Sequence, residues 1–241
     1  MDIPIVFEDD SLVVIDKPSG LVVNRAESVK GETLQDWIEK KFQISNFKFQ
    51  KLGESDFIRR SGIVHRLDKE TSGLLIIAKT PQAFVNLQLQ FKEREVVKKY
   101  TAIVHGKVTP AEGEIKADIG RLPWNRERFG ILPGAKSAHT SYKVISIYEK
   151  DKNFFSLLLV TPYTGRTHQI RVHLKYLGHP IVADNFYVGR KTYRSDIKFC
   201  PRIFLHASFL RFKHPETEQY TEFRSELPKD LKEVIGKLKK I

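Results

Sequence analysis

The sequence predicts an α+β fold with a mixed, largely antiparallel central sheet and flanking helices. Short apolar runs rich in β-branched residues outnumber the segments with helical periodicity. Most of these runs are joined by short turn-forming segments, which favours antiparallel pairing. No internal repeat, low-complexity tract or Pro/Ser-rich linker interrupts the chain. We therefore expect a single domain over residues 1–241.

In the first part of the chain, Thr33 is expected to cap a helix that places Leu34, Trp37 and Ile38 on one face. Thr80 and Pro81 are typical of the start of a second helix. The polar stretch 43–60 has no clear period and is expected to be a loop. The expected strands are 3–7, 12–15, 21–23 and 72–80, and the expected helices are 33–42 and 80–96.

In the second part of the chain, strands again predominate. An amphipathic helix is expected at the C-terminus, with Leu231, Val234, Ile235 and Leu238 on its apolar side. The expected strands are 98–106, 112–120, 136–150, 154–162, 203–215 and 219–228, and the expected helices are 170–177 and 228–241.

The composition is that of an ordinary globular protein, with 41% hydrophobic and 29% charged residues. No stretch approaches the ~20 apolar residues that a membrane-spanning helix needs. The first ten residues are acidic and do not resemble a signal peptide. The single cysteine, Cys200, excludes an internal disulfide framework, and a cytoplasmic protein is expected.

The charge balance points to the kind of partner. Lys and Arg total 41 against 29 Asp and Glu, a formal net charge of +12. Nucleic acid is the expected partner, because cationic side chains bind phosphates and release their counterions. An anionic membrane surface is the weaker alternative.

Three polar segments interrupt otherwise apolar elements: HRLD at 65–68, KKY at 98–100 and TGRTHQIRVH at 164–173. Each has a simple structural explanation. Asp68 can cap a turn, and Tyr100 can be a cross-strand aromatic residue. The third segment can be a solvated start of a helix, although its positive charge opposes the helix dipole and so favours an anionic partner.

Other chemistries have little support in the sequence. His168 and His173 are five residues apart, without an HExxH motif or a Cys/His array, so no metal site is expected. Cys200 lies in no catalytic motif and is expected to be inert. The chain has neither a P-loop nor a GxGxxG motif, so no nucleotide cofactor is expected.

The string HRLDKETSGLLIIAKT closely resembles the signature of the RluA-type pseudouridine synthases, in which HRLD precedes T-S-G and an apolar run ending in Ala-Lys. Four further blocks resemble the family in the same order: 9–23, 98–106, 164–184 and 205–215. Residues 43–60, 121–134 and 188–202 match poorly. The resemblance implies a pseudouridine synthase-like catalytic domain that isomerises uridine in RNA without a metal or organic cofactor.

The resemblance also implies roles for individual residues. Asp68 matches the essential carboxylate, and Tyr100 matches the active-site tyrosine that can stack on the base or help to remove the C5 proton. Arg166 matches the basic residue that pairs with the aspartate. A carboxylate suits this chemistry, because cleavage of a glycosidic bond builds positive character at C1′. Whether the carboxylate attacks carbon or removes a proton from the sugar stays open.

Contacts with the RNA are implied for three residues. Arg66 matches an arginine that can fill the space left by a flipped-out base. For Lys17 and Arg171, phosphate contact and a structural ion pair are both open. Many relatives carry an N-terminal S4-type RNA-binding module, which we expect to be absent here. The basic C-terminal helix can add RNA affinity or simply be a solvated face.

The leading hypothesis is therefore an isomerase that acts on uridine in structured rRNA or tRNA. RNA is the expected partner, with no membrane or protein partner implied, and a monomer is expected. Two other classes stay open: a non-catalytic RNA-binding protein or chaperone on the same fold, and a metal-dependent RNA hydrolase using His65, Asp68 and His168.

Overall fold

The computed structural model describes residues 1–27, 29–42 and 54–241. The chain divides into two compact units, each made of two segments of the sequence. The first unit comprises Met1–Val97 and Phe209–Ser225, and the second comprises Lys98–Ser208 and Glu226–Ile241. Strand β10 (Leu205–Lys213) begins in the second unit and ends in the first. The expectation of a single domain stays a prediction.

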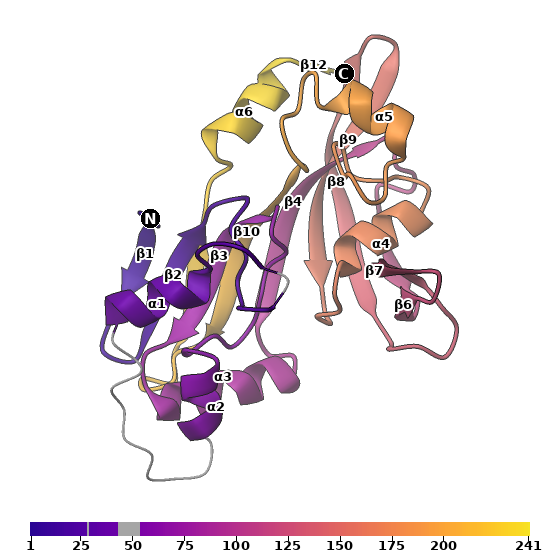
Figure 1. Ribbon diagram of the computed structural model, residues 1–241. Coiled ribbons are helices and arrows are strands. Elements are labelled where there is room, and N and C mark those ends of the chain that lie inside the picture. Colours follow the sequence, from indigo (N-terminus) through magenta and orange to yellow (C-terminus); the bar gives the residue numbers. More distant parts are fainter. Residues whose placement is uncertain (28, 43–53) are drawn as a thin grey trace. The chain divides into compact units, whose positions relative to one another are not determined.

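The first unit combines an antiparallel sheet with helices (Figure 1). Strand β2 pairs with β1 on one side and with β3 on the other, and β11 pairs with the end of β10. All seven residues of β3 are buried, as expected for a central strand. The elements are β1 (Ile5–Glu8), β2 (Leu12–Lys17), α1 (Leu34–Phe42), α2 (Glu54–Arg59), β3 (Ser72–Ala78), α3 (Pro81–Lys92) and β11 (Tyr220–Arg224).

The second unit is built around a long hairpin of β8 and β9 (Figure 1). Strand β4 pairs with β9, while β5 and β12 both pair with β8. Strands β6 and β7 form a separate two-stranded sheet. The elements are β4 (Val97–His105), β5 (Glu112–Lys116), β6 (Ile119–Leu122), β7 (Asn125–Ile131), β8 (His139–Lys150), β9 (Asn153–Pro162), α4 (Gln169–Tyr176), α5 (Arg190–Asp196), α6 (Lys229–Gly236) and β12 (Lys239–Lys240).

The predicted fold class is confirmed, because both units pair antiparallel strands and carry helices. The two predicted helix starts are also confirmed. The backbone N–H of Ala83 donates to the Thr80 side chain, and the N–H of Asp36 donates to Thr33 Oγ1 at 3.2 Å. Each bond satisfies a donor that the first turn of a helix leaves unpaired. None of the described helices is long and apolar enough to cross a membrane.

Four element predictions need correction. The strand predicted over 112–120 is divided between β5, which pairs with β8, and β6, which pairs with β7. Residues 21–23 do not form a strand, because the carbonyls of Val22 and Val23 accept hydrogen bonds from the first N–H groups of α1. Part of the predicted 43–60 loop is helix α2, while residues 43–53 lie outside the described part of the chain. The C-terminal helix ends at Gly236, and β12 follows it.

Candidate active site

Asp68 lies in an irregular segment of the first unit that leads directly into β3. The buried side chains of Val64 and Leu67 anchor the chain just before it, with 7% and 4% exposure. After it, the backbone N–H of Thr71 donates to the Asp68 carbonyl at 3.1 Å. The half-buried carboxylate therefore comes from a segment fixed on both sides, as a reacting group requires.

Lys17, at the end of β2, donates a hydrogen bond to the same segment. Its side chain is completely buried. The Nζ atom donates to the carbonyls of Pro18 at 2.8 Å, Leu21 at 3.0 Å and Lys69 at 3.1 Å. An ammonium has three donors, and three carbonyls accept from this one. This arrangement favours a structural role for Lys17 over the phosphate contact considered from the sequence.

The turn after Asp68 has two more contacts with the residues that follow Lys17. The N–H of Gly20 donates to the Lys69 carbonyl at 2.9 Å, and Ser19 Oγ donates to the Glu70 carbonyl at 2.7 Å. We call the contacts of Lys17, Ser19 and Gly20 with residues 69–70 the carbonyl clamp. The carbonyl clamp joins two of the sequence blocks that carry the family resemblance, so these two blocks are in direct contact in the folded chain.

The Lys17→Met variant is expected to lower the free energy of unfolding by about 1–3 kcal/mol, because it leaves buried carbonyls without that donor. Urea denaturation of the full chain measures this. Lys69→Met is the matched control: it removes the same charge from an exposed side chain and keeps the backbone carbonyl in the clamp. It is expected to stay within about 0.5 kcal/mol of wild type. Equal stability of Lys17→Met and wild type would contradict the clamp.

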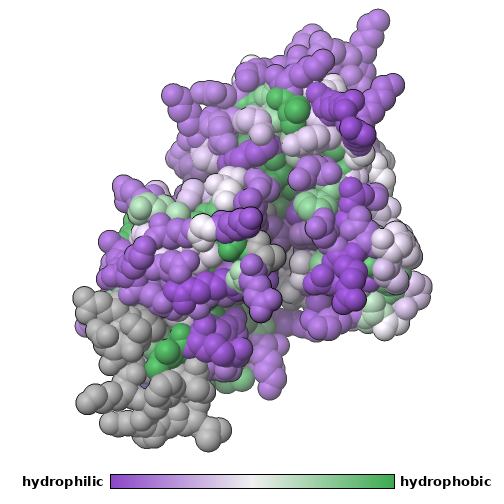
Figure 2. Space-filling view, in the orientation of Figure 1, coloured by the Kyte–Doolittle hydropathy of each residue, from purple (hydrophilic) through white to green (hydrophobic). Residues whose placement is uncertain are grey.

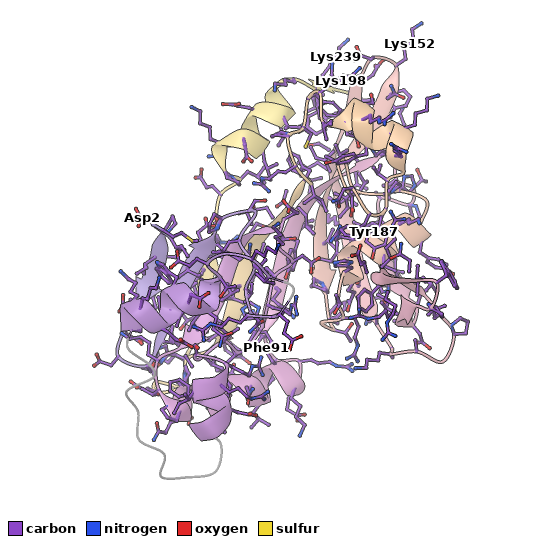
Figure 3. The ribbon with its side chains drawn as sticks, viewed as in Figure 1. Asp2, Phe91, Lys152, Tyr187, Lys198 and Lys239 are labelled. Carbon is purple, nitrogen blue, oxygen red and sulfur yellow. The ribbon has the colours of Figure 1, made fainter. Side chains whose placement is uncertain are left out.

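His65 and Arg66 differ in their surroundings. His65 Nε2 accepts a hydrogen bond from the backbone N–H of Ile76 at 3.1 Å, and its ring stacks on Phe91 with centroids 4.7 Å apart. Phe91 lies in the last turn of α3 (Figure 3). His65 therefore ties the segment to β3 and α3. Arg66 is exposed, and its predicted contact with RNA stays a prediction.

Tyr100 belongs to the second unit, where β4 places it opposite Val160 of β9. It is buried, with 8% exposure. Lys98 lies two residues earlier, and alternate residues of a strand share a face. Burial lowers the pKa of the Lys98 ammonium to about 8. The strand thus presents a tyrosine and a lysine of weakened basicity side by side along one face.

Lys98 is expected to lose its proton near pH 8, whereas the ordinary pKa of a lysine is 10.5. Reductive ¹³C-methylation followed by an NMR titration measures this, and a Lys98→Met sample assigns the resonance. The protonated form dominates below pH 8, and the neutral form dominates above it. A resonance that titrates at 10.5 would show that the ammonium is solvated in solution.

The segment before α4 is organised by Gln169, which the sequence analysis did not single out. Its Oε1 accepts from Thr164 Oγ1 at 2.6 Å and from the backbone N–H of Arg166 at 3.0 Å. Its Nε2 donates to the His139 carbonyl and to Thr140 Oγ1, both at 2.9 Å. One buried amide therefore fixes the loop that carries Arg166 against β8. Its position inside the THQIR string was the only signal in the sequence.

The two candidate arginines of this segment have different surroundings. Arg166 is half-buried, and its Nε donates to the Ser137 carbonyl at 2.9 Å. Arg171 is buried and makes a two-pronged ion pair with Asp184, in which both N···O distances are 2.8 Å. The side chains are 4% and 0% exposed. This geometry favours the structural ion pair for Arg171, one of the two alternatives left open by the sequence.

His168 precedes α4 in a left-handed conformation, with φ of 55°. Its Nδ1 lies 2.8 Å from the hydroxyl of Tyr187, and that hydroxyl also accepts from the N–H of Phe129 at 3.1 Å. Tyr187 is labelled in Figure 3. These contacts join the segment to β7, so His168 has a structural function whatever else it does.

The structure also bears on the other chemistries. Within residues 1–27, 29–42 and 54–241, no three His, Cys, Asp or Glu side chains are grouped to hold a metal ion. Cys200 is completely buried, and burial raises the pKa of its thiol to about 12. A protonated, inaccessible thiol is a poor nucleophile, which agrees with the prediction that Cys200 is inert.

Comparison with known proteins identifies the class to which this fold and these motifs belong. The family model described as RNA pseudouridylate synthase matches residues 11–176. Among solved structures, human RNA pseudouridylate synthase domain containing 1 superposes with a TM-score of 0.75 at 28% identity, covering 100% of this chain and 89% of that chain. Human RNA pseudouridylate synthase domain containing 4 has the same fold, with a TM-score of 0.71.

The relatives in sequence agree. An uncharacterized RNA pseudouridine synthase of Bacillus subtilis is 39% identical over 100% of this chain and 74% of its own length. Ribosomal large subunit pseudouridine synthase D of Pseudomonas aeruginosa is 37% identical over 95% of this chain and 70% of its own. This chain therefore belongs to the RNA pseudouridine synthase family and is an isomerase, which confirms the resemblance drawn from its motifs.

Proposed function

We propose that this protein isomerises specific uridines in structured rRNA or tRNA, with Asp68 as the essential carboxylate. The observation that carries the proposal is the fixed segment around Asp68. Buried apolar side chains hold it on one side and the carbonyl clamp holds it on the other. Such anchoring keeps a reacting group in place without further reorganisation, which lowers the barrier to reaction.

In the proposed reaction, the N1–C1′ bond of the target uridine breaks, the base turns within the site, and C5 bonds to C1′. The proton on C5 is then lost to a base and N1 takes up a proton from solvent, so uridine becomes pseudouridine with no atom added or removed overall. The Asp68 carboxylate acts on the sugar as positive character develops at C1′. Tyr100 supports the base by stacking and assists the loss of the C5 proton.

The proposal is tested with RNA that carries tritium at C5 of uridine. Incubation with rRNA and tRNA transcripts is expected to release tritium to water, because the C5 hydrogen is replaced by the bond to C1′. Mapping pseudouridines in RNA from cells that lack the protein then identifies the position. Absence of release from every RNA, together with tight RNA binding, would favour a non-catalytic RNA-binding protein.

From the family resemblance, Arg166 is proposed to be the cation that pairs with the Asp68 carboxylate. Arg166→Met is expected to lower the single-turnover rate on the order of 10²-fold, because removal of one electrostatic partner has effects of that size. The rate is followed by tritium release, and circular dichroism checks folding. A normal rate in folded Arg166→Met would contradict the assignment.

The place of action stays a prediction. A chain with one buried cysteine has no need of an oxidising compartment, which favours the cytoplasm.

A further inference from the structure

The second unit carries exposed cations from three segments that are distant in sequence. They are Lys152 in the turn between β8 and β9, Arg190, Lys191, Arg194 and Lys198 in and just after α5, and Lys239 in β12. We call these six residues the basic face. Figure 3 shows the labelled Lys152, Lys198 and Lys239 at the same end of this unit.

Contacts within the second unit bring the three segments together. The register of β12 places Lys239 opposite Glu149 of β8, and Glu149 precedes Lys152 by three residues. Phe199, which follows Lys198, has its carbonyl 3.5 Å from Lys237 Nζ. The same Phe199 packs against Phe155 of β9, with ring centroids 5.7 Å apart. The basic face is therefore held by a strand pairing and by an aromatic contact.

Two of the cations on α5 share one side of the helix. Arg190 and Arg194 are four residues apart, which places them on the same face, and Lys198 lies two residues beyond the end of the helix. The four cations from Arg190 to Lys198, together with Ser195, line one open surface pocket. Asp196, the acidic residue of α5, does not compensate them at the surface, because it is buried and bonded to His105 Nε2 at 2.9 Å.

The cations of the basic face also lack the carboxylate partners that others have. In the first unit, Arg25, Lys40, Arg59 and Lys79 each form an ion pair with Asp or Glu. In the part of the chain that the structure describes, none of the six cations of the basic face forms one. Like charges held together without partners repel one another. Such a cluster attracts an extended anion.

The space-filling view agrees with this picture. Figure 2 shows a predominantly hydrophilic surface over α5 and β12, interrupted by a small apolar area. The face lies beyond the His105 end of β4, since His105 contacts Asp196 of α5. Tyr100 is five residues back along β4, roughly 17 Å at the usual rise of a strand.

We propose that the basic face binds the phosphate backbone of the substrate RNA, at nucleotides outside the one that reacts. The inference rests on the proposed function, because that function makes structured RNA the extended anion available to this enzyme. Phosphate contacts of this kind set affinity and register without reading sequence. Four of the six cations lie in residues 188–202, outside the sequence blocks that carry the family resemblance and outside residues 11–176 of the family model.

The test compares two variants of the full chain that remove the same charge. Arg190→Gln/Arg194→Gln/Lys198→Gln neutralises the α5 part of the basic face. Lys30→Gln/Lys92→Gln/Lys213→Gln neutralises three lysines of the first unit. Glutamine retains helix propensity, and circular dichroism checks folding. Fluorescence anisotropy measures binding of a tRNA or rRNA fragment at several salt concentrations, without any need for turnover.

The α5 variant is expected to bind at least tenfold more weakly. The slope of log affinity against log salt is negative, and its magnitude is expected to decrease by roughly 0.7–0.9 for each phosphate that the variant no longer neutralises. The lysine control is expected to change affinity less than threefold. The lysine control is also expected to keep the single-turnover rate of wild type. Wild-type affinity and slope in the α5 variant, or an equal reduction in both variants, would overturn the inference.

Two further outcomes separate this inference from its foundations. If the wild-type protein releases no tritium but the α5 variant binds RNA more weakly than wild type, the proposed activity is wrong and the inference about the basic face is supported. Normal tritium release with unchanged RNA binding would remove the basic face alone. Vesicles containing about one-third phosphatidylserine test the membrane alternative. Vesicle binding that depends on the three cations, with RNA affinity unchanged, would overturn the assignment to RNA.

Discussion

Asp68→Asn is expected to lower the rate of pseudouridine formation on the order of 10³-fold or more. The asparagine side chain has nearly the same size and shape but no negative charge. It can neither attack C1′ nor accept a proton from the sugar, and it does not stabilise positive character there. The backbone bond from Thr71 to residue 68 and the carbonyl clamp do not involve the carboxylate, so the segment is expected to keep its conformation.

The measurement is single-turnover tritium release, with RNA affinity and melting temperature determined on the same samples. Asp16→Asn is the matched control, since it makes the same chemical change at another half-buried carboxylate of the first unit. Its rate is expected to stay within about threefold of wild type. If Asp68→Asn keeps its rate while it binds and folds normally, the carboxylate is not essential and the proposed mechanism fails.

The histidine and the arginine of the HRLD signature are expected to act in different ways. His65 is bonded to β3 and stacked on Phe91, so its substitution disturbs the segment that carries Asp68. Arg66 is exposed. A lower rate in His65→Ala would therefore arise through position and be accompanied by lower stability. For Arg66→Ala, weaker RNA binding at unchanged stability would support the predicted contact with RNA.

Local signals predicted the elements that depend on local interactions. Thr33 and Thr80 start helices because each side chain accepts a hydrogen bond from the first turn, and that pattern is visible in sequence. Residues 21–23 have the composition of a strand, yet their carbonyls bond to α1 and to Lys17. That choice depends on which donors the tertiary structure brings near, and no local pattern contains it.

Two of the missed elements, β12 and β7, share this dependence on distant partners. Strand β12 has two residues and exists because it pairs with β8, which lies far earlier in the chain. Strand β7 has the charged sequence NRERFGI and pairs with β6 in a small sheet. Neither sequence has the apolar alternation that indicates a half-buried strand.

Some features of the candidate site were predicted from the sequence, and others were visible only in the structure. The Asp68, Tyr100 and Arg166 assignments came from matched motifs, which preserve the order of residues. The clamp of Lys17 and the network of Gln169 came only from the structure, because a buried lysine and a buried glutamine look like surface residues in sequence. For Arg171, the structure favours the ion-pair alternative by placing Asp184 in bidentate contact.

Asp184→Asn is expected to have the second largest effect, on stability. The Asp184 carboxylate holds the buried Arg171 guanidinium by two hydrogen bonds of 2.8 Å, and it also accepts from the N–H of Phe186 at 3.0 Å. Removing one partner of a buried ion pair leaves an undercompensated charge, which costs about 3–5 kcal/mol. Urea denaturation is expected to show a destabilisation of this size with an unchanged slope.

Two comparisons establish that burial causes this effect. Asp56→Asn removes a carboxylate from the Arg59–Asp56 pair, whose side chains are 73% and 53% exposed, and should cost less than about 1 kcal/mol. Arg171→Met/Asp184→Leu removes both buried charges and should recover most of the stability that Asp184→Asn removes. If Asp184→Asn is no less stable than Asp56→Asn, the carboxylate is not what holds Arg171. If the double variant is as unstable as Asp184→Asn, the destabilisation comes from packing and backbone bonds around residue 184 and not from the charge.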